Sequence, residues 1–206
     1  MITDCTAIVL AGGDSHRMGR DKANVMLGDK TLLQTVTATM QQLFPRVIVS
    51  VRQPRAAIDL LQVCDDEPNG GPLAGLVASL GQITTPWAFI VACDMPFVVA
   101  EVVELLAGHR SRHQAVVPVV HGHLQPLAAF YAASCLAPLR ASLAARQNSL
   151  RDALKQLDVC YVSEAEMLNA DPQLRSFLDL DAPQDVEAAM NQEKTFGHRE
   201  HRDYRG

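Results

Sequence analysis

The sequence predicts an α/β fold in which a mostly parallel sheet is covered by helices on both faces. Two observations indicate this class. Short β-branched or apolar runs alternate along the chain with longer segments of helical periodicity, and the strand candidates are apolar at nearly every position. Ligands of such sheets bind at the carboxyl ends of the strands, so we expect the chemistry in the segments that follow strands.

The strand candidates share an apolar or β-branched composition, and they lie at 6–10, 46–51, 87–92, 115–120, 127–131, 159–162 and 177–180. After the first of them, apolar residues recur at helical spacing, at Leu32, Leu33, Val36, Met40 and Leu43. Thr31 is expected to begin this helix, because Thr-x-x-Gln at 31–34 has the form of a capping box. Further helices are predicted at 72–82, 98–109, 134–146 and 148–157.

Composition predicts one globular domain in the cytoplasm. The chain has 206 residues, of which 48% are hydrophobic, and a net charge of -5 that argues against a broad nucleic-acid or membrane surface. The five cysteines lie far apart and form no C-x-x-C, which is typical of reduced thiols, and no apolar run reaches the roughly 18 residues of a membrane span. We expect the domain at 1–191 and a polar tail at 192–206.

The segment "LAGGDSHRMGRDK" at 10–22 combines glycines with cations directly after the first strand candidate. It satisfies neither the Walker pattern nor the dinucleotide fingerprint. Gly12 and Gly13 nevertheless allow close backbone approach, Ser15 adds a hydroxyl donor, and Arg17 and Lys22 supply positive charge for phosphate oxygens. A solvated turn would explain the glycines but would leave the two cations unassigned.

This segment resembles the L-[AG]-G-x-S-x-R-[MF]-G-x-[DP]-K signature of nucleotidyltransferases with the Rossmann-like GT-A type fold, and it is most similar to the molybdenum cofactor guanylyltransferases, the MobA family. The resemblance runs from about residue 6 to 190 and implies a three-layer α/β/α sandwich with a mostly parallel central sheet. It assigns nucleotide binding here to Leu10, Ala11, Gly12, Gly13, Ser15 and Lys22. It assigns catalysis to Arg17, Lys22 and Asp94.

A second stretch, "NGGPLAGL" at 69–76, resembles the family motif G-P-L-x-G, which implies contacts to the base and ribose from Gly71, Pro72 and Leu73. The family has an aspartate shortly before this motif that binds guanosine. The resemblance assigns this contact to Asp66 first, with Asp65 as the second candidate. A helix N-cap or a solvated acidic turn is the alternative. The family often carries an asparagine at the end of the second strand, where this chain has Ser50.

In the stretch "WAFIVACDMPFV" at 87–98, Asp94 follows the apolar run "WAFIVA" by two residues. A carboxylate oxygen placed at the end of a strand suits Mg²⁺ as a ligand. The family's C-D-x-P metal motif matches this stretch, whereas Cys93 is interpreted as a packing residue. The stretch "FLDLDAPQDVEAA" at 177–189 resembles F-x-N-x-N-T-P-E-D-L, with Asp179 and Asp181 in place of the asparagines. Asp181 is therefore a candidate metal ligand as well as Asp94, and it is equally suited to cap a helix.

The stretch "HGHLQPLAAFY" at 121–131 resembles a family segment that lies beneath the second substrate. It suggests His123, Gln125 and Pro126 as contacts to a pterin or its phosphate. A β-hairpin turn around Gly122 explains the two histidines equally well.

The resemblance implies the transfer of GMP from GTP to molybdopterin or the molybdenum cofactor, with Mg²⁺ as cofactor and pyrophosphate as the second product. Catalysis would consist of positioning and charge neutralisation, without a nucleophilic side chain. The implied partners are these small molecules, with transient contact to cofactor-delivery proteins and acceptor molybdoenzymes, and neither nucleic acid nor membrane. Two alternatives are a cytidylyltransferase or other small-molecule nucleotidyltransferase on the same fold, and a non-catalytic nucleotide-binding protein.

Overall fold

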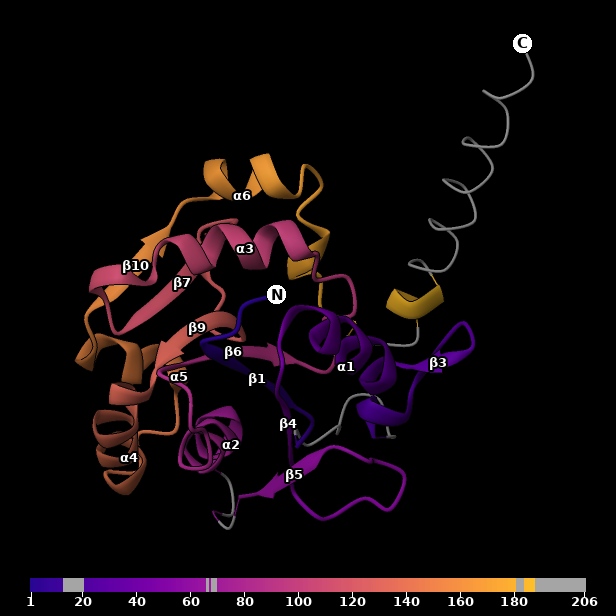
Figure 1. Cartoon of the computed structure of the whole chain (residues 1–206), viewed down its shortest axis with the longest axis horizontal. Coiled ribbons are helices and arrows are strands. Elements are labelled where there is room, and N and C mark those ends of the chain that lie inside the picture. The colour runs from indigo at the N-terminus through magenta and orange to yellow at the C-terminus, as the bar shows by residue number, and fades with distance from the viewer. Residues whose placement is uncertain (13–20, 66, 68–69, 181–183, 188–206) are drawn as a thin grey trace.

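The computed structural model describes residues 1–12, 21–65, 67, 70–180 and 184–187 (Figure 1). In chain order the strands are β1 (Cys5–Leu10), β2 (Met26–Leu27), β3 (Lys30–Thr31), β4 (Val47–Val51), β5 (Leu61–Cys64), β6 (Trp87–Ala92), β7 (Ala115–Val120), β8 (His123–Leu124), β9 (Ala128–Ala132) and β10 (Val159–Val162). The α-helices are α1 (Leu32–Leu43), α2 (Gly71–Leu80), α3 (Ala100–Gly108), α4 (Leu136–Ala144), α5 (Leu150–Ala153) and α6 (Glu164–Ala170).

The central sheet has the strand order β10-β7-β9-β6-β1-β4-β5, and β8 pairs with β7 outside this path. β1 runs parallel to both of its neighbours, β4 and β6, whereas β9 is antiparallel to β6 and β7. The chain leaves β1 for β4 on one side and later returns to β6 on the other. The carboxyl ends of β1 and β6 therefore form a topological switch point, which is where open α/β sheets bind ligands.

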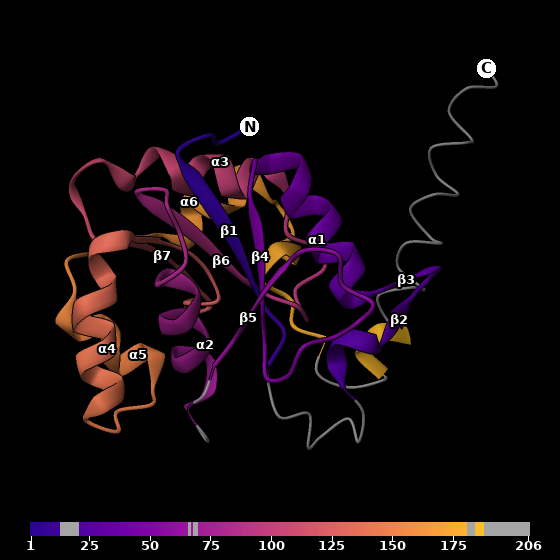
Figure 2. The same cartoon turned by 60° about the horizontal axis from the view of Figure 1, so that its bottom comes forward.

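Helices cover both faces of this sheet, which gives the three-layer sandwich that the resemblance implies (Figure 2). α1, α3 and α6 contribute buried residues to one apolar cluster, and α2, α4 and α5 to the other. The strands alternate between the two clusters: Phe89 and Val91 of β6 belong to the first, and Ala88 and Ile90 to the second. Burial on both faces explains why these strands are apolar throughout.

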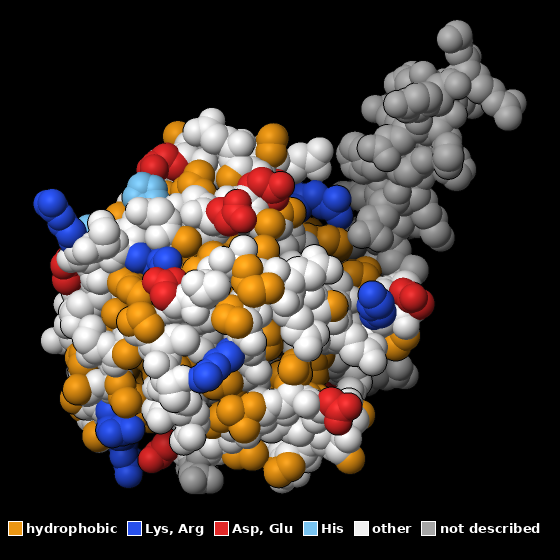
Figure 3. All heavy atoms as spheres, in the orientation of Figure 1, with side chains coloured by type: hydrophobic (Ala, Val, Ile, Leu, Met, Phe, Trp, Pro, Cys, Tyr) orange, Lys and Arg blue, Asp and Glu red, His pale blue; other side chains and the backbone are white. Residues whose placement is uncertain are grey.

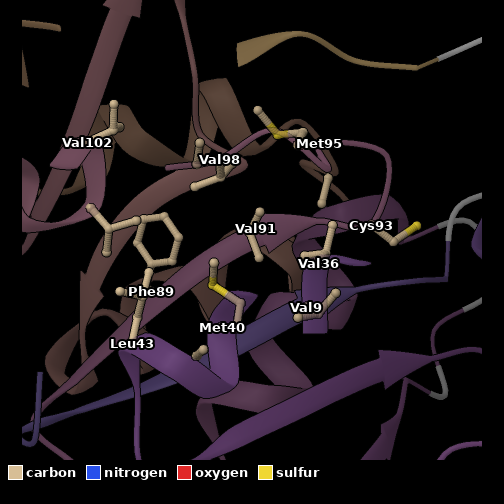
Figure 4. Packing of buried hydrophobic residues seen from close by; sticks show 14 of the residues in the cluster. Val9, Val36, Met40, Leu43, Phe89, Val91, Cys93, Met95, Val98 and Val102 are labelled. Atoms are coloured by element: carbon tan, nitrogen blue, oxygen red, sulfur yellow. The ribbon is translucent and has the colours of Figure 1, made fainter. Parts of the chain in front are cut away.

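The packing of α1 against the sheet shows how its sequence periodicity is used (Figure 4). Val36, Met40 and Leu43 lie one helical turn apart and are buried in the same cluster as Val9 and Val91. This contact packs α1 along the sheet, and the Leu43 carbonyl at its end accepts from the backbone N–H of Ile2 at 2.8 Å.

Most of the predicted elements are confirmed, with shifts of a few residues at their ends. The predicted strand at 177–180 is wrong: a 3-10 turn occupies Arg175–Phe177, and residues 178–180 belong to no strand. Its apolar side chains are buried separately instead, Phe177 in the cluster under α3 and Leu180 against Leu32 and Val186. β5 and α6 were not predicted, because both are short and each carries polar or exposed positions.

The surface is mixed in charge. On the face in Figure 3, acidic and basic side chains are scattered among apolar and neutral ones. Within the described ranges, no helix has both the length and the apolar character that crossing a bilayer requires.

The capping box predicted at the start of α1 is present. The Thr31 hydroxyl accepts from the backbone N–H of Gln34 at 3.1 Å, and the Gln34 side chain accepts from the backbone N–H of Thr31 at 2.8 Å. Thr31→Ala should therefore lower the free energy of unfolding by about 1 kcal/mol, measured by denaturant titration. Thr39→Ala, in the middle of the same helix, is the control. Equal effects of the two substitutions would contradict a specific contribution of the cap.

Candidate active site

A cleft lies where the carboxyl ends of β1 and β6 meet. Leu10 and Ala92 are register partners at this edge, and the backbone N–H of Cys93 donates to the Leu10 carbonyl at 3.0 Å. The backbone N–H of Ala11 donates to the Ser50 carbonyl at the end of β4, at 2.8 Å. The described residues that line the cleft are Leu10, Ala11, Gly12, Asp21, Lys22, Ala23, Ser50, Asp65, Gly71, Pro72, Gly75, Ala92, Cys93, Asp94 and Leu127.

An ion pair crosses this cleft. Lys22 Nζ lies 2.8 Å from Asp94 Oδ2, and both side chains are mostly buried, with 22% and 17% of their areas exposed. Lys22 begins a 3-10 turn (Lys22–Asn24) that Asp21 caps by accepting from the backbone N–H of Ala23 at 3.1 Å. The cation predicted for phosphate binding and the carboxylate predicted for metal binding therefore face each other, although 72 residues separate them.

The backbone around Asp94 is held independently of its side chain. The Asp94 carbonyl accepts from the N–H of Leu180 at 2.9 Å, and the N–H of Met95 donates to the Ala92 carbonyl at 3.2 Å. Asp94 is thus presented at the end of β6 by bonds that a side-chain substitution leaves in place.

A hard divalent cation suits this position. Asp94 offers carboxylate oxygens at the mouth of the cleft, and Mg²⁺ is commonly held by one or two carboxylates together with substrate phosphates and water. The described residues contain no group of three or more His, Cys, Asp or Glu side chains arranged to hold a metal. Asp94 is the described residue that would hold such an ion, and the ion would supply charge neutralisation there.

The opposite wall of the cleft is the first part of α2. Gly71 has φ +59°, and Pro72 follows it in the first turn, which gives the helix its start. A Cβ atom placed on Gly75 would lie 2.6 Å from Ser50 Oγ and 3.4 Å from Leu10 Cδ2. Glycine at this position therefore lets α2 approach the ends of β1 and β4 closely and keeps the cleft open.

Cys93 lies beside Asp94 but is a packing residue, as the sequence indicates. Burial, and to a lesser extent the adjacent Asp94 carboxylate, raises the pKa of its thiol to about 12. The thiol is therefore protonated at neutral pH, and it is not available as a nucleophile.

The structure brings most of the described candidate residues together. The cleft is lined by the predicted residues Leu10, Ala11, Gly12, Lys22, Ser50, Gly71, Pro72 and Asp94. Leu73 is not among its lining residues, because its side chain is fully buried in the core under α2. Asp65, the second candidate for the guanosine contact, lines the cleft. Five candidates lie outside the described residues, namely Gly13, Ser15, Arg17, Asp66 and Asp181.

A second pocket adjoins the cleft through the shared residues Pro72 and Leu127. Gln125 and Pro126 line it, together with Arg151 of α5. His123 is not among the lining residues, and its side chain is exposed on β8. The hairpin alternative is confirmed, since His121 and Gly122, with φ 52° and 72°, form the two-residue turn between β7 and β8.

Several residues at the cleft were missed from the sequence. Gly75 is the last residue of the "GGPLAG" motif, so this motif could have identified it as a residue of the site. Arg52 and Arg55 follow β4 and donate to the carbonyls of Gly12 and Ala11, at 2.9 and 3.0 Å. No pattern marks these two arginines, because the cleft residues that their side chains contact lie more than 30 positions away in the sequence.

The arrangement suits the binding of a polyphosphate and the transfer of one of its groups. The turn at Ala11 and Gly12, the lysine Lys22 and the aspartate Asp94 that follows β6 converge on one cleft. Such a site positions phosphates and neutralises developing charge without forming a covalent enzyme intermediate.

Comparison with known sequences points to the same chemistry. A family model described as a MobA-like NTP transferase domain matches residues 7–160. A protein of Pelotomaculum thermopropionicum named probable molybdenum cofactor guanylyltransferase is 33% identical over 184 residues, which are 88% of this chain and 89% of that protein. A Chloroflexus aggregans protein of the same name is 34% identical over 189 residues, 88% of this chain and 91% of the relative.

Solved structures agree on the architecture. The molybdopterin-guanine dinucleotide biosynthesis protein A of Archaeoglobus fulgidus superposes with a TM-score of 0.81 at 27% identity, over 92% of this chain and 99% of the other. The 2-C-methyl-D-erythritol 4-phosphate cytidylyltransferase of Thermus thermophilus superposes with a TM-score of 0.65 at 16% identity, over 92% and 98%. The second likeness shows the fold alone.

Proposed function

The chain belongs to the family of MobA-like NTP transferase domains, and on that premise we propose that it transfers GMP from GTP to the terminal phosphate of molybdopterin or the molybdenum cofactor. Pyrophosphate is the second product. The observation that carries this proposal is the convergence of Lys22 and Asp94 on the cleft where β1 and β6 end.

The reaction forms one P–O bond and breaks another. The terminal phosphate of the acceptor attacks the α-phosphorus of GTP, and the bond to the β-phosphate breaks as pyrophosphate leaves. Lys22, which lines the cleft, neutralises charge on the triphosphate and on the leaving pyrophosphate. On the strength of the sequence resemblance, backbone N–H groups of the glycine-rich segment would orient the phosphates. Arg17 would add a second cation on the strength of the sequence resemblance.

Asp94 is the residue that would hold Mg²⁺, with Asp181 as a second candidate. A bound magnesium ion supplies charge neutralisation at the phosphates. Asp94 would hold that ion at the end of β6, where its carboxylate pairs with Lys22.

The two adjoining pockets suit the two substrates. The cleft between β1, β6 and α2 is assigned to GTP, with Ser50, Asp65 and Gly71 near the base and ribose. The second pocket, where Gln125 and Pro126 lie, is assigned to the molybdopterin moiety. Pro72 and Leu127 line both, so the acceptor phosphate can reach the α-phosphate across their boundary.

The remaining expectations belong to the same proposal. The transferase domain would span 1–191, and 192–206 would form a polar tail of a cytoplasmic protein. Cofactor-delivery proteins and acceptor molybdoenzymes would be its transient partners.

Pyrophosphate release tests the proposed function. Purified protein, Mg²⁺ and molybdopterin cofactor are supplied with GTP, CTP or ATP in turn, and we expect release with GTP. Release mainly with CTP would overturn the guanylyl assignment in favour of a cytidylyltransferase. Absence of release with all three would contradict transfer to molybdopterin.

Gly75→Ala should impair nucleotide binding more than turnover. The added methyl group would lie 2.6 Å from Ser50 Oγ, and because Ser50 is buried in the sheet, either its side chain or α2 must shift. We expect the KM for GTP to rise about tenfold, as for an overpacked site. Gly108→Ala is the matched control, because nothing lies within 4 Å of a Cβ at that helical glycine. An unchanged KM in Gly75→Ala would contradict the assignment of this wall to GTP.

A further inference from the structure

Arg55 contacts the glycine-rich segment at 10–22 near both of its ends. Its Nη2 donates to the Ala11 carbonyl at 3.0 Å, directly after β1. Its Nη1 lies 2.6 Å from Asp21 Oδ2, directly before Lys22. One guanidinium group therefore joins two points that are ten residues apart in the sequence.

Arg55 is itself held by the edge of the sheet. Its backbone N–H donates to Gln62 Oε1 at 2.8 Å, and its carbonyl accepts from Gln62 Nε2 at 2.9 Å. Gln62 lies in β5, and its Nε2 also donates to the Ile58 carbonyl at 3.1 Å. The loop that carries Arg55 is thus anchored to a strand rather than only to the surface.

The contact with Asp21 leads directly to Lys22. Asp21 caps the 3-10 turn in which Lys22 is the first residue, and Lys22 Nζ reaches Asp94 at 2.8 Å. An ion pair that fixes the Asp21 carboxylate also fixes the position from which the Lys22 side chain extends across the cleft.

We propose that Arg55 is a positioning residue for the transfer reaction, which ties Ala11 to Asp21 and so holds Lys22 opposite Asp94. This inference rests on the proposed function. It requires arginine, because a planar guanidinium presents two donors to two partners at once, whereas a lysine ammonium lacks that fork. Arg55 acts through Asp21 and Ala11 and is not assigned a contact with substrate.

Steady-state kinetics of Arg55→Gln and Arg55→Lys test the proposal. Both variants should lower kcat about 30-fold, because a small misplacement of a charge-neutralising group is costly to the reaction. If Arg55 contributed only its positive charge, Arg55→Lys would instead keep a kcat close to that of the wild type. Arg110→Gln is the matched control: Arg110 is also mostly buried and pairs with an aspartate, Asp4, at 3.1 Å, but it lies outside the cleft.

Coupling to Asp21 gives a second test. Asp21→Asn removes the charge that Arg55 pairs with, so the double variant with Arg55→Gln should be no slower than the slower single variant. If the losses in kcat of the two single variants were fully additive in the double variant, the inference that Arg55 acts through Asp21 would be overturned.

A third test does not depend on turnover. Amine labelling of the ligand-free protein, read by mass spectrometry, compares Lys22 with Lys155, which pairs with Asp152 on the surface. Arg55→Gln should raise the labelling rate of Lys22 about fivefold and leave Lys155 unchanged. Wild-type kcat together with wild-type labelling of Lys22 would overturn the inference and leave the proposed function standing. If the wild-type protein itself shows no turnover, the proposed GMP transfer is contradicted. The labelling rate of Lys22 in Arg55→Gln then still tests whether Arg55 positions Lys22.

Discussion

Replacing Lys22 with alanine is expected to lower kcat for GMP transfer about 10³-fold while changing the affinity for GTP much less. The lysine neutralises charge that increases on the phosphates as pyrophosphate leaves, so its contribution is larger in the transition state than in the ground state. Its position supports this expectation, since Nζ lies 2.8 Å from Asp94 Oδ2 with only 22% of the side chain exposed. The measurement is kcat from pyrophosphate release, with the Kd for GTP from calorimetry.

Lys155→Ala is the matched control for this prediction. Lys155 also pairs with an aspartate, Asp152, at 2.6 Å, but the pair is exposed and lies outside the cleft. It should leave kcat unchanged. Lys22→Arg keeps the charge and should retain more activity than Lys22→Ala. A kcat of Lys22→Ala equal to that of the wild type would remove Lys22 from the mechanism.

Asp94→Asn is expected to lower kcat to a similar extent, about 10³-fold, and to raise the Mg²⁺ concentration needed for half-maximal activity. The amide keeps the shape of the side chain but loses the negative charge that a hard cation requires. Folding should be preserved, because the loop at Asp94 is held by backbone hydrogen bonds from Leu180 and to Ala92. Activity as a function of Mg²⁺ concentration is the measurement.

Asp152→Asn serves as the control, since it neutralises a carboxylate that likewise pairs with a lysine. It should leave both kcat and the Mg²⁺ dependence unchanged. If Asp94→Asn kept the wild-type Mg²⁺ dependence, the metal would have to be assigned to other residues. A melting temperature equal to that of the wild type would show that any loss is not one of folding.

The layered fold was predictable because its central strands carry a strong local signal. Strands buried on both faces must be apolar at every position, as in "AIVL" of β1 and "WAFIVA" of β6, and the helices between them show their own periodicity. The capping box at Thr31 was readable for the same reason, since its two partners are three residues apart.

Short and peripheral elements were less predictable. β5 has exposed Leu61 and polar Gln62, so it lacks the pattern of a buried strand, and Gln62 is used to anchor the loop at Arg55. The run at 177–180 has the apolar pattern of a strand but does not form one. Its apolar residues are explained by burial of Phe177 and Leu180 in two different clusters, with no strand beside it to pair with.

The candidate site divides in the same way. The sequence by itself determined which residue types follow β1 and β6 and where the "GGPLAG" motif lies, and therefore that Lys22, Asp94 and this motif were candidates. Only the tertiary structure decided that Leu10 and Ala92 lie in register, that Lys22 reaches Asp94, and that Arg55 joins Ala11 to Asp21. The reason is physical: a motif is written in local spacing, whereas a contact across many residues exists only after the strands have paired and the helices have packed on them.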